Sequence, residues 1–478
     1  MSSKTIKPSN SKTIESLNIH LIGIGGTGMN GLANCLIARG YQVSGSDNQS
    51  SPVVQQLRSK GIKVYLGHHS DNLKSGTQLV VKSAAIRDDN PELIKAERLK
   101  IPVVKYSEML GCLMRDKYGI AIAGCHGKTT TSAMIAWLLS RARLDPSFVI
   151  GGYVTDLSNS AYAGKGKYFV AEACEYDRSF LNLSYRIAVI NNIEADHLDY
   201  YRDLTEIKRA FRTFASRIPK DGFIIANADD PNVRRALKDI KHKIIWFGLT
   251  GAHRTPHNAQ RQVTWTARNI ARRDNKYHFT VYHTGRKYAD FTLKVLGIHN
   301  IYNALSAIAV ADLLEINKST IKKSLGEFSG VARRFQTLGA YNGALVIDDY
   351  GHHPTEIRAV LGTARAVFPQ KRLWTVFQPH QASRTRLFLA DFARAFTIPD
   401  KVILPDIYFA RDSAAERRRI TSKDLAREIN KRGGDALYLP SFALIIKYLK
   451  KRLTENDVVI TMGAGDVWKI AHQLITYN

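Results

Sequence analysis

The sequence lacks an apolar run of about twenty residues, the length that a helix needs to cross a bilayer. Residues 1–18 are polar and contain no apolar segment of the kind that secretion signals carry. Cysteine is scarce: the chain has four, Cys35, Cys112, Cys125 and Cys174, and their spacing matches no metal-binding motif. We therefore expect free thiols, a reducing compartment, a cytoplasmic location and no insertion into a membrane.

Acidic residues are also few: the chain has 42 Asp and Glu and 69 Lys and Arg, so its net charge is +27. Such a charge attracts anionic metabolites and binds nucleic acids without sequence specificity. The basic runs 272–273, 417–419 and 450–452 are dispersed and do not alternate with aromatic residues, as a base-stacking surface requires. We expect a basic solvated surface and no specific nucleic-acid partner, with a nucleic-acid-dependent ATPase as an alternative.

The length of 478 residues exceeds what one hydrophobic core normally supports. Short apolar runs alternate with helical patterns, which predicts parallel sheets. The predicted strands cover residues 19–24, 42–46, 119–123, 168–171, 188–191, 223–226, 345–347, 373–377, 402–404 and 458–461. The polar stretch 250–275 predicts a hairpin or a loop insertion.

Three restarts of this pattern predict three α/β domains, at residues 1–117, 118–332 and 333–478. The first would be Rossmann-like. The second would be a P-loop-type domain with a mainly parallel sheet, and the third would again be Rossmann-like.

The first glycine-rich turn reads G-x-G-x-x-G over residues 23–28, between a predicted strand and a helix expected from about Met29 to Arg39, and Asp47 ends the next strand. Glycines let the backbone approach a pyrophosphate, and the helix N-terminus adds partial positive charge. Taken alone, this pattern indicates a dinucleotide, and it leaves an NAD-dependent oxidoreductase open as an alternative.

The second turn combines Gly124, Gly127, Lys128 and Thr129 between a strand and a helix that runs to about Arg141. Backbone amides would hold phosphates, the lysine would neutralise their oxygens, and the threonine hydroxyl would hold Mg²⁺. The two glycines are closer together than in the common phosphate loop. However, a turn with a purely structural role rarely needs two glycines, a lysine and a threonine at these positions. A plain dehydrogenase leaves this second loop unexplained.

Acidic residues follow two of the predicted strands in the middle of the chain. Glu172 and Glu175 follow one strand, and 194–199, with two aspartates, a glutamate and a histidine, follow another. If these strands are neighbours in one sheet, the acids meet at the phosphate loop, where Mg²⁺ prefers oxygen ligands. Asn300 and Asn303 carry amides suited to an adenine edge, although Asn300 could equally cap a helix.

Seven blocks together resemble the Mur ligases, and within that family the alanine-adding branch. They lie in the family's order over nearly the whole chain, at residues 24–29, 124–131, 192–197, 297–303, 333–335, 348–356 and 377–380.

The resemblance implies an ATP-dependent ligase that joins L-alanine to UDP-N-acetylmuramate through an acyl phosphate, in the synthesis of peptidoglycan precursor. ATP and Mg²⁺ would be its cofactors, and the chain would be a monomer or a homodimer. A relative that attaches a whole tripeptide to the same sugar is the alternative. Its first loop typically has Cys and Phe where this chain has Gly25 and Gly28.

The resemblance also implies roles for individual residues, carried over by position. Catalysis would involve Lys128, His197 and Glu172, and Mg²⁺ would be held by Thr129, Glu172 and His197. ATP would contact Gly124, Cys125, His126, Gly127, Lys128, Thr129, Thr130, Asn300, Arg334 and Asp349. The UDP-sugar would contact Gly25, Gly26, Thr27, Gly28, Met29 and Asp47, and the amino acid would contact His353, His380 and Arg384.

Two positions depart from the family pattern. Cys125 replaces a usual threonine, which matters little if the backbone binds the phosphate. Gln381 replaces a usual arginine that would pair with the carboxylate of the incoming amino acid, so its presence predicts weaker binding of that amino acid.

Overall fold

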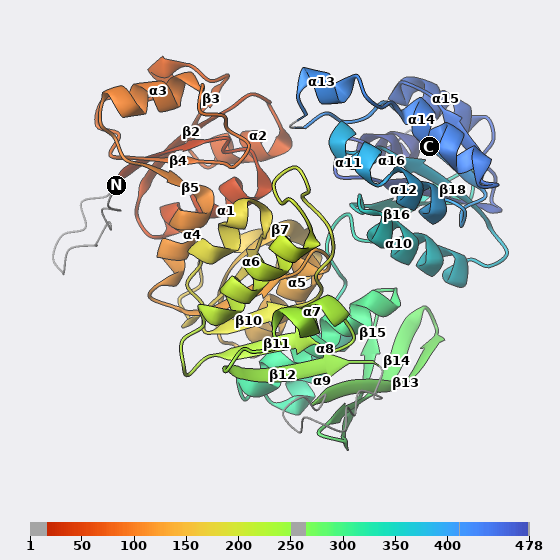
Figure 1. Cartoon of the computed structure of the whole chain (residues 1–478), viewed down its shortest axis with the longest axis horizontal. Helices are drawn as coiled ribbons and strands as arrows, with labels where there is room; N and C mark the ends of the chain where they lie inside the picture. Colours follow the sequence, from red (N-terminus) through yellow and green to blue (C-terminus); the bar gives the residue numbers. More distant parts are fainter. Residues whose placement is uncertain (1–16, 250–263, 411, 477–478) are drawn as a thin grey trace. The chain divides into compact units, whose positions relative to one another are not determined.

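The computed structural model describes residues 17–249, 264–410 and 412–476. The chain divides into two compact units, one of residues 1–113 with 161–163 and the other of residues 114–160 with 164–478. The first unit contains one sheet and the second contains two (Figure 1). No helix among the described residues is both long and apolar enough to cross a membrane.

The first unit is built on a five-stranded parallel sheet in the order β3-β2-β1-β4-β5. Its elements are β1 (Asn18–Ile22), α1 (Thr27–Ala38), β2 (Gln42–Asp47), α2 (Pro52–Ser59), β3 (Lys63–Leu66), β4 (Leu79–Lys82), α3 (Pro91–Arg98), β5 (Val103–Lys105) and α4 (Tyr106–Met114), with a short 3-10 helix at Ser70–Asn72. Ile22 and Val80 of neighbouring strands pack with Leu93 of α3 in its core. The strand order reverses beside β1, so the turn after β1 lies at the switch point where ligands of such sheets bind.

The second unit begins with a ten-stranded sheet in the order β15-β14-β13-β12-β11-β10-β6-β9-β7-β8. Its strands are β6 (Tyr118–Ala123), β7 (Ser147–Val154), β8 (Asn159–Tyr162), β9 (Tyr168–Ala173), β10 (Ile187–Ile190), β11 (Phe223–Asn227), β12 (Lys243–Gly248), β13 (Trp265–Arg273), β14 (Lys276–His283) and β15 (Arg286–Leu293). Its helices are α5 (Lys128–Arg141), α6 (Leu204–Ser216), α7 (Pro231–Ala236), α8 (Ile298–Leu313) and α9 (Lys318–Glu327), with 3-10 helices at Thr155–Leu157 and Tyr176–Asn182.

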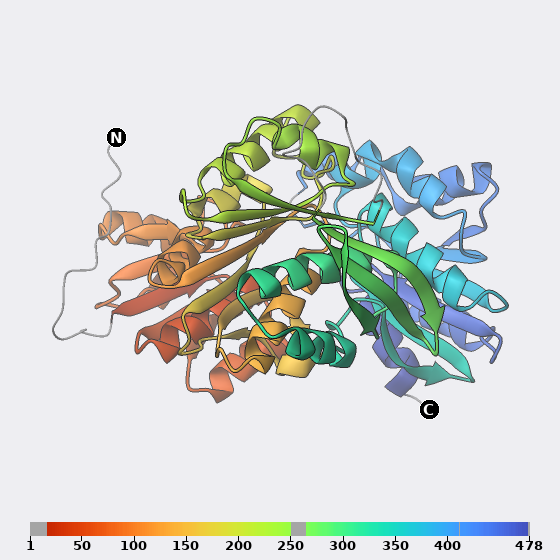
Figure 2. The ribbon, with the colours of Figure 1, turned by 90° about the horizontal axis from the view of Figure 1, so that it is seen from below.

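The centre of this sheet is parallel and buried on both faces. Strand β6 pairs in parallel with β9 on one side and with β10 on the other. Residues 120–123 and 187–190 are fully buried, as in strands covered by helices on both sides. Figure 2 shows α6 and α7 in yellow-green on one side of the strands and α8 and α9 in teal on the other. The carboxyl ends of β6, β9 and β10 therefore meet at one edge.

The C-terminal sheet has the order β16-β17-β21-β18-β19-β20, parallel except for the edge pair β16 and β17. Its elements are β16 (Gln336–Tyr341), β17 (Ala344–Asp349), α10 (Pro354–Val367), β18 (Arg372–Phe377), α11 (Ala382–Leu387), α12 (Leu389–Ala395), β19 (Lys401–Leu404), α13 (Ala414–Arg417), α14 (Ser422–Lys431), β20 (Ala436–Tyr438), α15 (Phe442–Lys450), β21 (Asp457–Met462) and α16 (Trp468–Thr476). Leu373 and Phe377 pack against α10 and α12, whereas Trp374 and Val376 pack against α15 and α16. This alternation buries both faces of β18.

The predicted α/β class is confirmed by these sheets and by their parallel centres. Each predicted strand exists, with bounds that differ by one or two residues, and the first helix begins at Thr27 instead of Met29. Residues 1–16 and 250–263 lie outside the described residues. The described remainder of the stretch 250–275 forms a β13–β14 hairpin with positive φ at Asp274 and Asn275, which suits a two-residue turn. The domain boundaries at 117/118 and 332/333 stay predictions.

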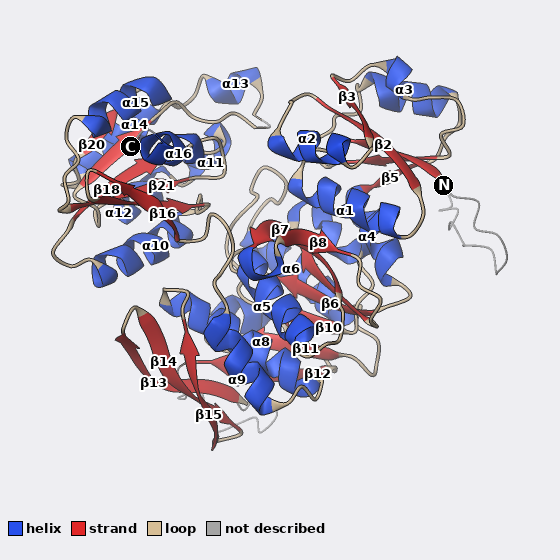
Figure 3. Cartoon of the chain, turned by 180° about the vertical axis from the view of Figure 1, so that it is seen from behind, coloured by secondary structure: helices blue, strands red, loops and turns tan. Residues whose placement is uncertain are grey.

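An antiparallel extension, β13–β15, contains the β13–β14 hairpin and a third strand, β15, that was not predicted. It continues the ten-stranded sheet past β12, as the red strands beside α8 and α9 in Figure 3 show. Its inward residues Phe279 and Phe291 stack in the central core, at 5.9 Å between ring centroids. The extension therefore enlarges the core that supports α8, the helix that carries Asn300.

Candidate active site

The first glycine turn joins β1 to α1 and is tied to Asp47 at the end of β2. Gly23 has φ +82°, a conformation that favours glycine. The amide of Gly25 donates to Asp47 Oδ2 at 2.9 Å, and a Cβ at Gly25 would lie 2.8 Å from that oxygen. Gly26 caps α1 without a side-chain bond. The amides of Gly25 and Gly26 are thus used within the turn, the second by the Gly23 carbonyl at 3.2 Å, and the amides of the first turn of α1, from Thr27 on, are the ones that can face an anion.

The remaining residues predicted to bind the UDP-sugar divide into exposed and packed positions. Thr27 is exposed at the start of α1, whereas Met29 is buried in the core. A Cβ at Gly28 would lie 3.0 Å from the ring of Tyr106, so the glycine also allows a close packing contact. Contacts of all six residues with a UDP-sugar stay predictions.

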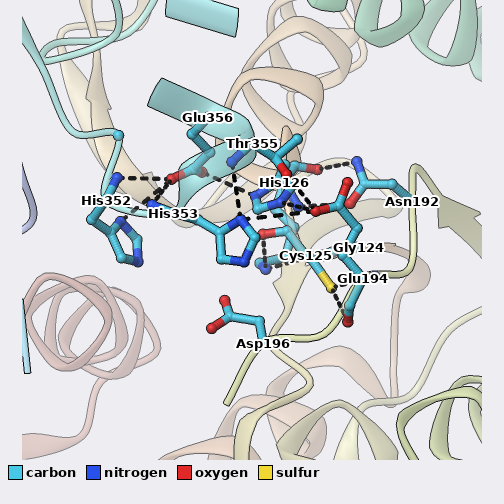
Figure 4. A network of polar contacts seen from close by, with 12 residues as sticks. Gly124, Cys125, His126, Asn192, Glu194, Asp196, His352, His353, Thr355 and Glu356 are labelled. Atoms are coloured by element: carbon cyan, nitrogen blue, oxygen red, sulfur yellow. Dashed lines mark hydrogen bonds and ion pairs between the residues drawn. The ribbon is translucent and has the colours of Figure 1, made fainter. Parts of the chain in front are cut away.

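The second glycine turn connects β6 to α5 and is fixed by Asn192. Gly124 and Gly127 have φ +144° and +78°, and a Cβ at Gly127 would lie 2.5 Å from Asn303 Oδ1. The amide of His126 donates to Asn192 Oδ1 at 2.8 Å, and Asn192 Nδ2 donates to the His126 carbonyl at 3.1 Å. Figure 4 shows Asn192 beside the turn. The turn is therefore preformed with its amides at the N-terminus of α5.

Cys125, where the family usually has threonine, is buried in this turn. Its thiol donates to the Glu194 carbonyl at 3.4 Å and accepts from the Glu194 amide at 3.2 Å. Burial raises the pKa of the Cys125 thiol well above its usual value, and Glu175 adds to the effect. The side chain therefore acts as a small neutral group that holds the turn against the loop after β10.

Lys128 is the first residue of α5, and its ammonium lies over the turn. It donates to the Gly124 carbonyl and pairs with Glu175 at 3.0 Å. Burial opposes the charged form, but the carboxylate of Glu175 outweighs it and raises the pKa of Lys128. The lysine is therefore a fixed cation, and the phosphates of a nucleotide would share it with Glu175.

Two carboxylates and one imidazole converge near Lys128, from the ends of β9 and β10. Nε2 of His197 lies 3.6 Å from Glu175 Oε1 and 3.8 Å from Asp196 Oδ2. His197 has φ +53°, and its buried Nδ1 has no hydrogen-bond partner. The three side chains place one ligand atom each within 4.8 Å of one another. Such a set can hold a divalent cation or position a phosphoryl group.

The metal ligands predicted from the sequence are only partly brought together. His197 joins Glu175 and Asp196, as described above. Glu172 instead accepts a hydrogen bond from the Gly151 amide at 2.6 Å, and Thr129 Oγ1 accepts from Arg334 at 3.4 Å. From the sequence, Glu175 and Asp196 were named in the acidic clusters but were not predicted as metal ligands. The clusters were expected to meet if their strands were neighbours; β9 and β10 lie instead on opposite sides of β6, and the acids still converge.

A cavity of about 200 Å³ opens beside the phosphate loop. Its lining includes the predicted residues His126, Gly127, Thr130, Asn300, Arg334 and Asp349. Asn303, named with Asn300 from the sequence, also lines the cavity. Phe247 and Tyr302 add aromatic faces, and the amides of Asn191 and Asn227 add hydrogen-bonding groups that the sequence reasoning missed. The buried Asn191 Oδ1 has no partner. Amides and aromatic rings around a phosphate loop suit a purine base.

Asp349 and Arg334 form the part of this cavity that comes from the C-terminal sheet and the segment before it. The Asp349 carboxylate accepts from the amides of Phe335 at 2.7 Å and Gly351 at 2.6 Å. Burial raises the pKa of Asp349 to about 6, although Arg334 opposes the shift. Arg334 also lies 3.9 Å from Glu356. Asp349 therefore fixes the chain around Arg334 and lines the cavity.

Arg384, predicted to bind the amino acid, forms a buried ion pair with Asp196. The two side chains are each 6% exposed and lie 3.0 Å apart, joining α11 to the loop after β10. Arg384 NH1 also lies 3.3 Å from His380 Nδ1. Burial would raise the pKa of Asp196, but the Arg384 guanidinium holds it far below its usual value.

Gln381 begins α11 with φ +70° and is 2% exposed. With Asp196, His197, Ser383, Arg384, Leu387 and Phe388 it lines a small second cavity. His353 caps α10 through Nδ1, which accepts from the Thr355 amide at 3.3 Å. Three residues were predicted to contact the amino acid. Arg384 lines this small cavity, His380 contacts Arg384, and His353 caps α10.

These features define a phosphate-loop enzyme with an α/β fold and a purine-sized cavity. Three family models match the chain: "Mur ligase family, catalytic domain" at residues 18–118, "Mur ligase middle domain" at 122–311 and "Mur ligase, glutamate ligase domain" at 333–465. The chain belongs to the Mur ligase family.

Proteins similar to this chain carry two related names. A protein of Acetivibrio thermocellus named UDP-N-acetylmuramate–L-alanine ligase is 45% identical over 96% of this chain and 95% of its own length. The crystal structure of the UDP-N-acetylmuramate-alanine ligase of Thermotoga maritima has a TM-score of 0.80 at 29% identity and covers 96% of this chain and 98% of its own. A murein peptide ligase of Psychrobacter arcticus has a TM-score of 0.73 at 27% identity, with coverages of 96% and 98%.

Proposed function

We propose that this chain is an ATP-dependent ligase that forms the amide bond between UDP-N-acetylmuramate and L-alanine during peptidoglycan precursor synthesis. One observation carries the chemistry: Lys128 of a preformed phosphate loop is paired with Glu175, whose carboxylate also faces His197. The identity of 45% to a ligase of that name over nearly the full chain supports the choice of substrates. The NAD-dependent alternative leaves the second loop and its cavity without a use.

The reaction needs activation, because a carboxylate repels an amine and has no good leaving group. An oxygen of the lactyl carboxylate attacks the γ-phosphorus of ATP, ADP departs, and an acyl phosphate results. The amine of alanine then attacks the acyl carbon, and phosphate leaves with that carboxylate oxygen. Phosphoryl transfer depends mainly on positioning and charge neutralisation. In this chain Lys128 and the turn amides supply these, close to His197.

The residues around His197 fit Mg²⁺, because carboxylate oxygens and an imidazole with an unpartnered nitrogen converge there. His197, Glu175 and Asp196 would hold the ion, and Glu172 and Thr129 are further ligands that the family resemblance proposes. Bound there, Mg²⁺ would neutralise negative charge on the phosphates.

The other assignments follow from the same proposal. Backbone amides of the first turn of α1, at Thr27, Gly28 and Met29, would bind the UDP diphosphate, and Asn300 would bind adenine. His353, His380 and Arg384 would serve the amino acid, although Arg384 must then share its guanidinium with Asp196. A cytoplasmic location is proposed because the free cysteines suit a reducing compartment.

The test is phosphate release from ATP with UDP-N-acetylmuramate and, in turn, alanine, serine, glycine and the tripeptide. We expect release to require the sugar nucleotide and to be fastest with alanine. Lys128→Ala should abolish release while the fold, followed by circular dichroism, survives. Preference for the tripeptide would replace the proposal with the activity named for the murein peptide ligase, and turnover by Lys128→Ala would refute the role of the lysine.

A further inference from the structure

We propose that His126 is a positioning residue that ties the phosphate loop to α10 and thereby holds one wall of the nucleotide cavity in place. The inference deepens the proposed function and rests on it. Its basis is the placement of a single imidazole between two carboxylates from distant parts of the chain.

The backbone and the side chain of His126 have separate partners. Asn192 holds the backbone on both its amide and its carbonyl, as described above. The imidazole extends from the turn toward Glu356, with Glu194 on its other side (Figure 4). Nε2 lies 3.3 Å from Glu194 Oε2 and Nδ1 lies 3.2 Å from Glu356 Oε1. The side chain thus has its charge partners in the protein itself.

Each carboxylate is in turn held by the first turn of α10. Glu356 Oε2 accepts from the amide of His353 at 3.3 Å as part of the capping box, and also from the amide of His352 at 3.0 Å. Glu194 Oε2 accepts from the Thr355 hydroxyl at 2.7 Å. Because both acids are bound to the same helical turn, His126 connects the phosphate loop to α10 through two paths.

The geometry requires a cation at His126. Nε2 is hydrogen-bonded to Glu194, and Nδ1 has Glu356 Oε1 at 3.2 Å as an ion-pair contact without hydrogen-bond geometry. A neutral imidazole would turn a lone pair toward one of these two carboxylates, whereas the charged ring attracts both. Burial lowers the pKa of His126, but the nearby carboxylates of Glu194 and Glu356 outweigh it and raise the pKa to about 10. The side chains are mostly shielded, with 14% of His126 and 13% of Glu356 exposed. Shielding strengthens such pairs relative to surface ones.

A metal ion is a poorer explanation of this cluster. His126, Glu194 and His353 lie close enough to share a cation. However, Nδ1 of His353 accepts from the Thr355 amide, and a cation there would face the positive end of α10. The ion pairs therefore account for the cluster without a metal.

The pair lies at the cavity wall. The first two turns of α10 supply Thr355, Glu356, Ala359 and Val360 to the lining, opposite His126 and Gly127. Loss of the His126–Glu356 pair would let this wall move away from the loop. Binding of ATP would weaken, while the contacts of Lys128 with the phosphates would remain. KM for ATP should therefore rise more than kcat falls.

A double-mutant cycle of His126→Gln and Glu356→Gln tests the proposal. Glutamine at 356 can still accept at the capping box, so α10 keeps its start. We expect each single variant to weaken ATP binding, measured by calorimetry, about tenfold, the effect of losing one hydrogen bond to a charged group. The double variant should be no weaker than either single one, and His126→Lys should recover part of the loss. His278→Gln on β14 is the matched control and should bind as the wild type does.

Additive losses in the double variant would mean that His126 contacts the nucleotide directly, and they would overturn the proposal. Unchanged binding in both single variants would overturn it as well. Because binding is measured without the sugar nucleotide or alanine, the cycle is separate from the proposed function. A wild-type chain that binds ATP but does not ligate would overturn the function alone.

Discussion

The buried ion pair between Arg384 and Asp196 gives a quantitative test of how the C-terminal part is attached to the active site. Both side chains are 6% exposed and 3.0 Å apart. Arg384→Met keeps much of the volume but removes the guanidinium from the buried Asp196 carboxylate. That carboxylate is left with the His197 amide and the imidazoles of His197, His352 and His353. Removal of one partner of such a pair costs about 3 kcal/mol, at the lower end of the usual range.

For an unfolding unit the size of the C-terminal part, each kcal/mol lowers the melting temperature by about 2–4 °C. We therefore expect Arg384→Met to melt about 6–12 °C below the wild type in differential scanning calorimetry. Arg386→Met is the matched control, because Arg386 is 40% exposed and pairs with Glu416 at the surface. Its cost should stay below about 1 kcal/mol. Asp196→Asn combined with Arg384→Met should recover part of the loss.

The pH dependence supplies a second check on the same pair. The pKa of Asp196 is depressed in the folded state, so its contribution to stability is complete above the unfolded pKa of about 3.9. The contribution is lost as pH falls from there through the folded pKa. The difference between wild type and Arg384→Met should be constant above about pH 5 and shrink below pH 4. Equal melting temperatures of the Arg384 and Arg386 variants at pH 7 would refute the reasoning.

Three further predictions concern single residues. Gly127 has φ +78°, and a Cβ there would lie 2.5 Å from Asn303 Oδ1, so Gly127→Ala should weaken ATP binding at least about tenfold in calorimetry. Gly362 of α10 has open space for a Cβ, so Gly362→Ala should bind ATP as the wild type does. The pKa of Asp349 is raised to about 6, so this residue stabilises the fold at acid pH, and its contribution falls as pH rises from about 4 to 6. Asp349→Asn should flatten that part of the profile of unfolding free energy against pH, measured by urea titration. An unchanged profile would contradict the assignment. Gln381→Arg should lower KM for alanine in the phosphate-release assay, and an unchanged KM would show that the position does not contact the amino acid.

The parallel strands and both glycine turns could be predicted from the sequence, because buried strands of parallel sheets are short apolar runs that end in turns. Strands β6 and β10 illustrate this, because the predicted bounds 119–123 and 188–191 differ from the observed bounds by no more than one residue at each end. The strands of the antiparallel extension past β12 have a weaker signal. Strand β13 begins with the buried Trp265 but ends in Arg272 and Arg273, so its outer half has no apolar signal.

The active-site residues could be named from the sequence, but their partners could not. His126 and Glu356 are 230 positions apart, and Asp196 and Arg384 are 188 positions apart. A local pattern contains no information about such pairs. The end of β9 matters in the same way: Glu172 lies inside the strand and accepts from the Gly151 amide, whereas Glu175 lies beyond the strand and faces His197.

The central claim is that the lactyl carboxylate is phosphorylated before the amide bond forms. It is tested most directly with UDP-N-acetylmuramate whose lactyl carboxylate carries ¹⁸O, incubated with the full chain, ATP, Mg²⁺ and alanine. Mass spectrometry of the released phosphate should show one ¹⁸O atom per phosphate when both oxygens of the carboxylate are labelled, with ADP as the other product. Unlabelled phosphate, or AMP in place of ADP, would contradict the account.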